Sequence, residues 1–306
     1  MAFDAKRTAT TGRFLLEVGN SRAAFLKSFS GLAFEAEQTK HDMATESFRT
    51  RQISTFKYSD AKAKIGMNQS GEIADWIRAS FKRQCMVKSG AFTAANFDYK
   101  ATHRIEFRDA LIKEIAFPKL DGTSKEGGYM DLTFQAEDCQ HLKANGEDIK
   151  GDVNTSAKMW QPHMFRLEVA GLEDACRRVS TIDPFTCKQA VVIDAIGPHR
   201  IHTIHAANLD LGNIKCTFSA ADADPWAQWA DAWFRQGKCL TSDHKDGAIV
   251  FLGPGGDDIG RIELKQLGLL KFDAGEHTAN AETVKRITVE MYVQEAEIHF
   301  ESKSQS

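Results

Sequence analysis

Hydrophobic and polar residues alternate in several short segments of the chain. In "FLLEV", residues 14–18, the first, third and fifth side chains point to one face of a strand and the other two point to the opposite face. The segment "FRLEV", residues 165–169, has the same pattern and begins 151 positions later in a chain of 306 residues. Such a match indicates an internal repeat if further segments recur in the same order.

Three further pairs of segments recur in that order. They are "IADWIRASFKRQ" (73–84) with "WAQWADAWFRQGK" (226–238), "RIEFRD" (104–109) with "RIELKQ" (261–266), and "MDLTFQAED" (130–138) with "VEMYVQEAE" (289–297). The offset between the copies grows from 151 to 159, as small loop insertions would produce. We therefore predict two domains of ordinary size, residues 1–145 and 163–306, joined by a polar, Gly- and Asn-containing linker over residues 146–162.

One helical pattern occurs in each half. Apolar side chains recur at helical spacing, with Ile73, Trp76, Ile77 and Phe81 in the first half and Trp226, Trp229, Trp233 and Phe234 in the second. Asp224 is a suitable N-cap for the second helix, ahead of a proline at its first position. We expect Trp76, Phe81, Trp229 and Phe234 to anchor the helices on their sheets. The alternative is that the tryptophans form a binding face.

The other periodic segments read as strands separated by turn residues, such as "GPGGDDIG" at 253–260. Many strands with one helix per half predict a mostly-β (α+β) fold of two tandem domains. Each domain would be a β-sandwich or barrel closed by one packed α-helix. The polar stretches 35–54 and 188–200 have little apolar periodicity and are typical of an extended loop or an edge hairpin.

Composition excludes some classes of protein. The net charge is −3 and 42% of residues are hydrophobic, and no segment approaches the roughly 18 apolar residues of a membrane helix. The N-terminus has no apolar signal region, so we expect folding in the cytoplasm. The six cysteines form no C-x-x-C pair, which favours buried thiols over disulfides or zinc.

The halves differ in charge. Residues 1–150 hold 23 Lys and Arg against 20 Asp and Glu, whereas residues 151–306 hold 16 against 22. The values of +3 and −6 are too small to indicate a nucleic-acid-binding face. Opposite signs would favour contacts between unlike halves.

No motif indicates an enzyme. The histidines of "PHRIHTIH", residues 198–205, lie three apart and alternate faces on a strand, so they do not converge on a metal. The glycines of "GPGGDDIG" lack the Lys-Ser/Thr of a phosphate loop, and a strand follows them. We expect no catalytic residues, no cofactor and no metal.

The order of these parts resembles the tail tube proteins of contractile-tailed phages and related contractile injection systems. The resemblance covers residues 14–137 best, through "SGL" (30–32), "FKYSDAKAKIG" (56–66) and "DW" (75–76). The second half is looser, with "STI" (180–182) in place of "SGL" and "QW" (228–229) in place of "DW". Family members usually have one such domain and a Pro-Gly before the third strand, where this chain has "QISTF".

The resemblance implies a structural subunit of a hollow tube built from stacked six-membered rings. Its expected partners are its own copies, sheath, baseplate or tail-terminator proteins, and DNA or protein cargo in the lumen without sequence-specific binding. The particle would be a phage tail or an injection machine. A rival reading is a two-domain, β-rich protein that binds a ligand or carbohydrate without forming tubes.

Two fused domains change the expected ring. Three chains would supply six domains, so we predict a homotrimer with pseudo-sixfold symmetry in which first and second halves alternate. Stretches 35–54 and 188–200 are expected at subunit interfaces because they have too little apolar content to order alone. The candidate contact residues are Glu46, Arg49, Arg51, His199 and Arg200.

Overall fold

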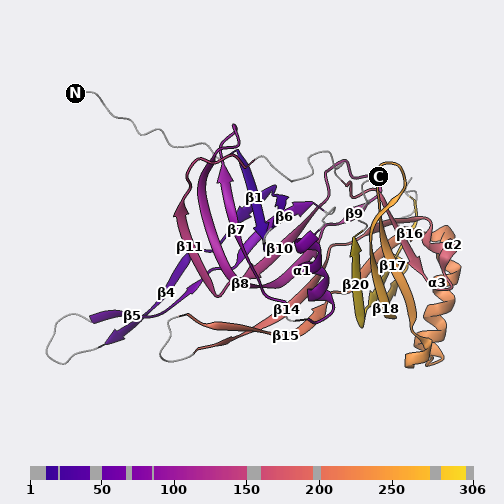
Figure 1. Cartoon of the computed structure of the whole chain (residues 1–306). Coiled ribbons are helices and arrows are strands. Elements are labelled where there is room, and N and C mark those ends of the chain that lie inside the picture. The colour runs from indigo at the N-terminus through magenta and orange to yellow at the C-terminus, as the bar shows by residue number, and fades with distance from the viewer. Residues whose placement is uncertain are drawn as a thin grey trace, which may run out of the picture.

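The computed structural model describes residues 12–19, 21–41, 50–66, 71–84, 86–149, 160–195, 201–275 and 284–300. Two large, strongly curved antiparallel sheets lie side by side, with two β-hairpins projecting from their base (Figure 1). This arrangement confirms the predicted mostly-β fold, because each sheet folds back on itself in a barrel-like manner.

The first half contributes eleven named strands and one helix. They are β1 (Arg13–Val18), β2 (Ser21–Phe25), β3 (Ser28–Ser30), β4 (Phe34–His41), β5 (Thr50–Tyr58), β6 (Ala61–Gly66), α1 (Gly71–Phe81), β7 (Lys88–Ala95), β8 (Ala101–Phe117), β9 (Leu120–Asp121), β10 (Tyr129–Gln135) and β11 (Asp138–Lys143). The order of strands in its sheet is β2-β1-β7-β8-β10-β6-β3, with β11 also paired to β8.

The second half repeats this plan. Its elements are β12 (Phe165–Val169), α2 (Glu173–Cys176), β13 (Val179–Ile182), β14 (Phe185–Asp194), β15 (Thr203–Leu211), β16 (Ile214–Ser219), α3 (Ala223–Ala230), β17 (Lys245–Leu252), β18 (Asp258–Asp273), β19 (Arg286–Tyr292) and β20 (Glu295–Phe300). The order β12-β17-β18-β19-β16-β13 corresponds strand for strand to β1-β7-β8-β10-β6-β3. The helix α2 stands where the first half has β2.

The register of the strand pairs shows which residues of the two halves are equivalent. Phe92 lies opposite Ile105 in β7 and β8, and the residues 157 positions later, Ile249 and Ile262, lie opposite each other in β17 and β18. The "RIEFRD" and "RIELKQ" segments therefore occupy equivalent positions, as predicted from the sequence.

At two of the matched segments, the equivalent residues in the structure differ from those aligned by sequence alone. In the structure Leu132 corresponds to Val289, which moves "MDLTFQAED" two positions from the alignment made on letters alone. Likewise Ile182 corresponds to Phe29 rather than to the leucine of "SGL", whose counterpart is Phe185. The first displacement is by two residues and the second by three. Side chains in a strand alternate faces with a period of two, so the shift by two leaves the hydrophobic pattern intact and is invisible in the sequence.

The long strands β8 and β18 bend at equivalent residues. Asp109 and Gln266 adopt left-handed conformations, with φ of 48° and 56°, and their amides donate to Ser89 Oγ and Asp246 Oδ1 at 3.0 Å each. Before the bend β8 pairs with β7 and β11, and after it with β10 and β14. A bulge that redirects the strand lets one strand serve two faces of the curved sheet.

Glycine is required beside each bend. A Cβ atom at Gly90 would lie 2.1 Å from the carbonyl oxygen of Glu17, and one at Gly247 would lie 2.5 Å from that of Glu168. These two glycines are also 157 residues apart. The close approach of neighbouring backbones explains why both halves keep glycine at this position.

The helices pack as expected except at one residue. Trp76, Phe81 and Trp229 are buried, but Phe234 is 52% exposed, so the prediction that it anchors its helix is wrong. After Ala230 the helix continues as a π-helical turn (Asp231–Arg235). Its buried face consists of Trp226, Trp229, Ala230 and Trp233, which leaves Phe234 on the outer side.

The start of α3 also differs from its prediction. The helix begins at Ala223, after a 3₁₀ turn (Ala220–Asp222) that Ser219 caps through a hydrogen bond from the amide of Ala221. Asp224 therefore lies inside the first turn and is not the N-cap. Asp222 is buried and pairs with Arg178 instead.

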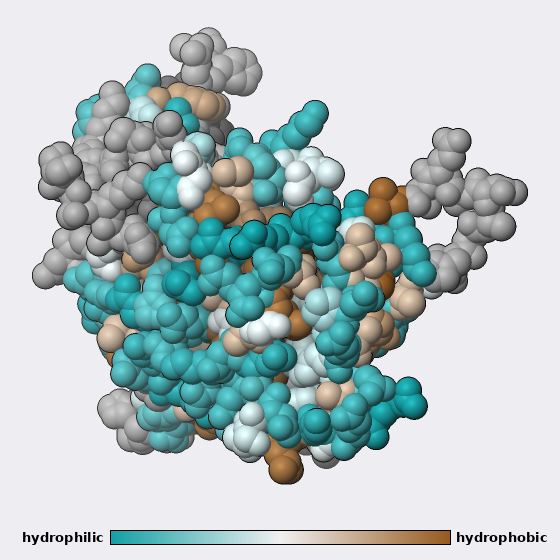
Figure 2. Space-filling model, turned by 90° about the vertical axis from the view of Figure 1, so that its right-hand side faces the viewer, coloured by the Kyte–Doolittle hydropathy of each residue, from teal (hydrophilic) through white to brown (hydrophobic). Residues whose placement is uncertain are grey.

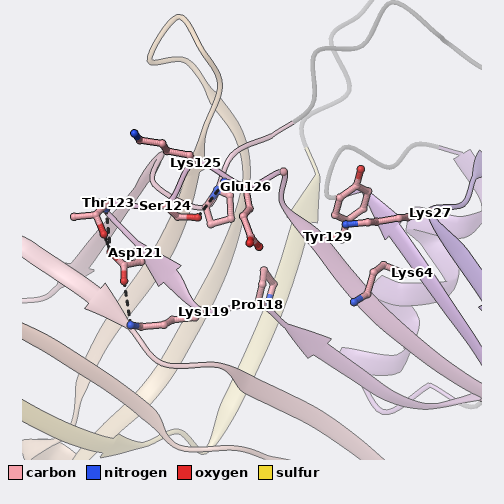
Figure 3. Close-up of a pocket in the computed structure, with 12 residues that line it drawn as sticks. Lys27, Lys64, Pro118, Lys119, Asp121, Thr123, Ser124, Lys125, Glu126 and Tyr129 are labelled. Atoms are coloured by element: carbon pink, nitrogen blue, oxygen red, sulfur yellow. Dashed lines mark hydrogen bonds and ion pairs between the residues drawn. The ribbon is translucent and has the colours of Figure 1, made fainter.

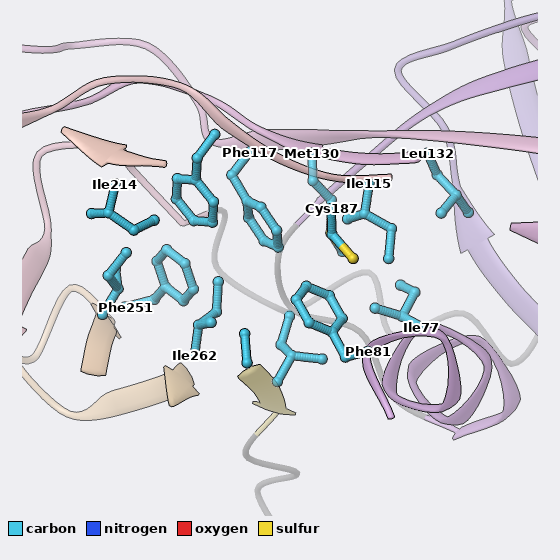
Figure 4. Close-up of a cluster of buried hydrophobic side chains, with 14 of the residues drawn as sticks. Ile77, Phe81, Ile115, Phe117, Met130, Leu132, Cys187, Ile214, Phe251 and Ile262 are labelled. Carbon is cyan, nitrogen blue, oxygen red and sulfur yellow. The ribbon is translucent and has the colours of Figure 1, made fainter. Parts of the chain in front are cut away.

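One hydrophobic cluster runs through both halves. Figure 4 shows Ile77 and Phe81 of α1 facing Ile115 and Phe117 of β8, with side chains of the second half continuing the same layer. Trp160, which lies in the predicted linker, is buried as well and makes an edge contact with Phe251 at 5.1 Å. The two halves thus share a core, and the domain boundaries at 145 and 163 remain a prediction.

The outer surface is largely polar. Figure 2, which views the side that carries α2 and α3, shows a mainly hydrophilic surface with hydrophobic side chains in small separate patches. Within the described ranges, no helix has the length and apolar character needed to span a membrane.

Candidate functional site

One depression of the described surface is lined mainly by polar groups. It has a volume of about 490 Å³ and lies between the first sheet and the loop after β9 (Figure 3). Its lining consists of Lys27, Lys64, Pro118, Lys119, Asp121, Thr123, Ser124, Lys125, Glu126, Gly127, Tyr129 and Pro162. Four lysines give it a positive character.

The polar groups of this depression serve the local structure. Thr123 donates to Asp121 through both its side chain (2.7 Å) and its amide (2.9 Å), and these bonds together with Lys119 lower the pKa of Asp121 to about 2. Lys27 lies 4.5 Å from the centre of the Tyr129 ring. A carboxylate held by its own turn is a poor proton acceptor at neutral pH, so this geometry favours a turn-stabilising role.

The cysteines lack the setting of reactive thiols. Cys139, Cys176, Cys187 and Cys216 are buried, and burial raises the pKa of the first three to about 12 and that of Cys216 as well. A thiolate is the reactive form, so these four groups are inert near neutral pH. In the part of the chain that the structure describes, no group of three or more His, Cys, Asp or Glu side chains could hold a metal ion.

One contact with both polar and apolar parts joins the two halves. The hairpin β14–β15 leaves the second half, and β14 adds to the edge of β8 as an antiparallel strand (Figure 1). Phe185 lies opposite Phe117 with stacked rings 4.6 Å apart, and Cys187 lies opposite Ile115. We call this contact the intrachain joint.

Phe81 completes the apolar part of the intrachain joint. It lies in the last turn of α1 and borders a narrow apolar space together with Phe185, Cys187, Leu211, Ile262, Leu264, Val293 and Ala296, all from the second half. Its ring is also 6.3 Å from that of Phe117. The first-half helix is therefore held by the second half as well as by its own sheet.

Ion pairs between the two halves lie at the rim of the intrachain joint. Lys188 lies 3.6 Å from Glu114, directly opposite it in the strand pair, and Lys82 lies 3.1 Å from Glu297. Glu297 also accepts from Lys265 at 2.9 Å. Lys265, which contributes most, and Lys82 together lower the pKa of Glu297 to about 2.

Acid should weaken this rim. The pKa of a glutamate in an unfolded chain is about 4.3, so the stabilisation from Glu297 is complete above that pH and is lost as the pH falls through about 2. We expect the thermal midpoint of Glu297→Gln to fall less steeply than that of the wild type between pH 5 and pH 2. Glu295→Gln serves as the control and should follow the wild type. Equal slopes for Glu297→Gln and the wild type would contradict the assignment.

A second strand crosses between the halves. β9 leaves the first half and pairs with β13, with Leu120 opposite Ile182 and Asp121 opposite Thr181. It forms the end of the second sheet, so that β13 has a partner on both sides. In the first sheet the equivalent strand β3 is the end of the described strand order.

The hairpin β4–β5 is the first-half equivalent of β14–β15. It forms a separate two-stranded sheet that projects from the molecule (Figure 1), and residues 33–40 are all exposed. This confirms the edge hairpin that was one reading of stretch 35–54. Of the predicted interface residues, Arg51 is exposed in β5, whereas Glu46, Arg49, His199 and Arg200 lie outside the described residues.

Sequence reasoning did not single out the residues of the joint. Phe117, Phe185, Glu114 and Lys188 lie in ordinary alternating strands, and nothing in their spacing shows that the two strands pair. Residues 188–194 belong to the hairpin strand β14, which is the edge-hairpin alternative, and Lys188 at the start of this stretch pairs with the first half of the same chain. Opposite charges at Glu114 and Lys188 were the one available signal, and they become informative only when the register is known.

Comparison with known proteins supports one family. Residues 10–140 match the family described as T4-like virus tail tube protein gp19. This match confirms the resemblance to tail tube proteins over the first half. No curated protein matches the chain.

Similar solved structures each cover about half of the chain. One is a chain of "an Extracellular Contractile Injection System, PVC sheath-tube complex in extended state", with 16% identity and a TM-score of 0.41 over 46% of this chain and 95% of that chain. A second is the anti-feeding prophage tube-terminating cap, with 18% identity and a TM-score of 0.39 over 47% and 100%. A third is Hcp1 from Flavobacterium johnsoniae, with 12% identity and a TM-score of 0.28 over 44% and 97%.

Proposed function

We propose that this chain, whose residues 10–140 match the tail tube family, is a structural subunit of a hollow tube in a phage-like tail or injection particle. The observation that carries the proposal is the family match in the first half combined with the same strand order in the second. One chain would thus contribute two tube domains to a ring.

A trimer is the assembly that this organisation favours. If a ring holds six domains, three chains complete it, and the halves alternate around it with pseudo-sixfold symmetry. The intrachain joint already places unlike halves side by side. Residues 1–145 and 163–306 would be the two domains, with 146–162 connecting them.

The partners follow from the same proposal. Rings would stack on further rings, and sheath, baseplate or tail-terminator proteins would contact the outside or the ends. Cargo in the lumen, either DNA or protein, would pass without sequence-specific contacts. The chain would fold in the bacterial cytoplasm and then enter a virion tail or an injection particle.

A structural role also fits what the described surface offers. The polar depression around Asp121 uses its charged groups in its own turn, and the buried thiols are inert. The rival proposal, a ligand- or carbohydrate-binding protein, would need a concave site with convergent polar and aromatic groups. The depression holds one aromatic ring, that of Tyr129, and Lys27 already covers it.

Mass photometry and negative-stain electron microscopy of the purified protein test the proposal. We expect particles of three chains and ring-shaped images with six lobes, together with short stacks at high concentration. Rings of six whole chains would contradict the trimer while leaving the tube function in place. A monomer that assembles under no condition and binds a sugar or small ligand would support the rival function.

A further inference from the structure

Each half of the chain carries two complementary surfaces. The edge surface is the outer edge of the last third of the long strand, β8 or β18, and the hairpin surface is the first strand of the hairpin, β4 or β14. Within one chain the edge surface of the first half binds the hairpin surface of the second. One surface of each kind is left over, on β4 and on β18.

The hairpins are equivalent residue by residue. Phe34 lies opposite Tyr58 in the first hairpin, and Cys187 and Leu211, both 153 positions later, lie opposite each other in the second. The irregularity that follows Ala36 in β4 recurs at the same offset in β14. In the described chain β4 pairs with β5 alone, and an isolated hairpin of this kind is marginally stable in water.

The edges are equivalent as well. Leu132 lies opposite Ile115 across β10 and β8, and Val289 lies opposite Phe272 across β19 and β18, at an offset of 157. The outer edge of β18 over residues 270–273 has no strand partner among the described residues. Accordingly Ile115 is fully buried, whereas Phe272 is only partly buried.

We infer that β4 of one copy pairs antiparallel with the free edge of β18 of a second copy, in the register that β14 has on β8. This contact rests on the proposed ring and specifies how its chains are joined. Transferring the register by 153 and 157 positions places Phe34 opposite Phe272 and Glu35 opposite Lys271. Strand addition to an open edge supplies backbone hydrogen bonds, and the facing side chains supply selectivity.

The charges at this position are reversed between the halves. In the intrachain joint the edge carries Glu114 and the hairpin carries Lys188, whereas the free edge carries Lys271 and the free hairpin carries Glu35. A first half beside a second half therefore brings opposite charges together in both contacts, the one within a chain and the one between chains. A first half beside another first half would oppose Glu35 to Glu114, and two second halves would oppose Lys188 to Lys271. Like charges directly opposite destabilise a strand pair, so this reversal favours strict alternation.

Two further contacts transfer with the same register. In the intrachain joint the amide of Ile204 donates to Glu137 Oε1 at 2.8 Å. The equivalent residues are Arg51 in the free hairpin and Gln294 beside the free edge, and the amide oxygen of Gln294 can accept the same bond. Phe234, the counterpart of Phe81, would cover the neighbour's exposed Phe34.

The charged residues can be exchanged without disturbing the fold. The side chain of Lys271 is 62% exposed and lies 2.6 Å from Asp273 in the free chain, and Glu35 is exposed. Surface substitutions of this kind change stability little. Effects on assembly can therefore be separated from effects on folding.

A charge exchange tests the contact. We expect Glu35→Lys and Lys271→Glu each to lower the assembled fraction by about tenfold or more, because each variant opposes like charges. The double variant Glu35→Lys with Lys271→Glu should restore rings. Mass photometry gives the assembled fraction, and circular dichroism checks that each variant is folded.

Disulfide trapping tests the register. With Cys85 and Cys239 replaced by serine, Glu35→Cys combined with Lys271→Cys should give covalent chains of two and three subunits on oxidation. Glu37→Cys combined with Lys271→Cys is the matched control, since its Cα atoms would be about 7–8 Å apart, beyond the usual span of a disulfide. If the wild type forms rings, but the double charge variant does not regain them and the cysteine pair forms no cross-link, this contact is overturned while the tube function stands. A wild-type chain that never assembles would overturn both.

Discussion

Replacement of Trp76 by alanine is expected to lower the free energy of unfolding by roughly 3–5 kcal/mol. The side chain is completely buried between α1 and the first sheet, and its ring centre lies 5.5 Å from that of Phe134. Its indole N–H donates to the carbonyl of Met86 at 2.9 Å, which fixes the segment after the helix. Alanine would leave a large cavity and an unpaired carbonyl, so the loss should lie toward the upper end of that range.

Urea unfolding followed by circular dichroism, at concentrations below assembly, measures this effect. Trp229→Ala should cost less, toward the lower end of the range, because Trp229 is 7% exposed and no described group accepts its buried N–H. Trp76→Phe is the conservative control and should retain most of the burial while losing the hydrogen bond. A cost below about 1 kcal/mol for Trp76→Ala would show that the helix does not depend on this side chain.

Phe81 and Phe234 should give opposite results, although they occupy equivalent positions. Phe81→Ala is expected to cost roughly 3–5 kcal/mol, because its side chain is buried within the intrachain joint. Phe234→Ala should change the stability of the free chain by less than about 0.5 kcal/mol, since half of the side chain is exposed. It should nevertheless reduce assembly, because an exposed aromatic anchor would be lost from the interface.

The two measurements separate these effects. Unfolding of the free chain reports the cost of Phe81→Ala, and mass photometry reports the assembled fraction for Phe234→Ala. Phe234→Tyr is the matched control, since it keeps the aromatic area and adds a hydroxyl at a surface position. Normal ring formation by Phe234→Ala would exclude this residue from the contact between chains.

Local patterns in the sequence predicted the local structure well. The alternation around Leu16 and Leu167 correctly predicts first strands of the two halves, and the glycine-rich segment 253–260 correctly predicts a hairpin turn. Helical spacing correctly locates both helices. These features depend on side-chain periodicity and turn chemistry, which a sequence displays directly.

Contacts between the halves could not be predicted in this way. Whether β14 pairs with β15 alone or also with β8 depends on which edge is open in the folded sheet. The exposure of Phe234 has a similar origin, because the residues that bury its counterpart Phe81 come from the other half of the chain. In both cases the missing information is the neighbouring element, which for Phe234 would come from another copy of the chain in the proposed ring.

The reversed charges have a consequence for synthesis on the ribosome. The N-terminal half emerges first, and until residue 188 has been made, the residues of β4 and β5 are present while those that pair with the edge of β8 are still missing. At that stage a hairpin from the same nascent chain or from one on a neighbouring ribosome could occupy the edge. Glu35 would then face Glu114, and this repulsion disfavours the premature pairing. We therefore expect the edge of β8 to remain unpaired until Lys188 has been synthesised and can pair with Glu114.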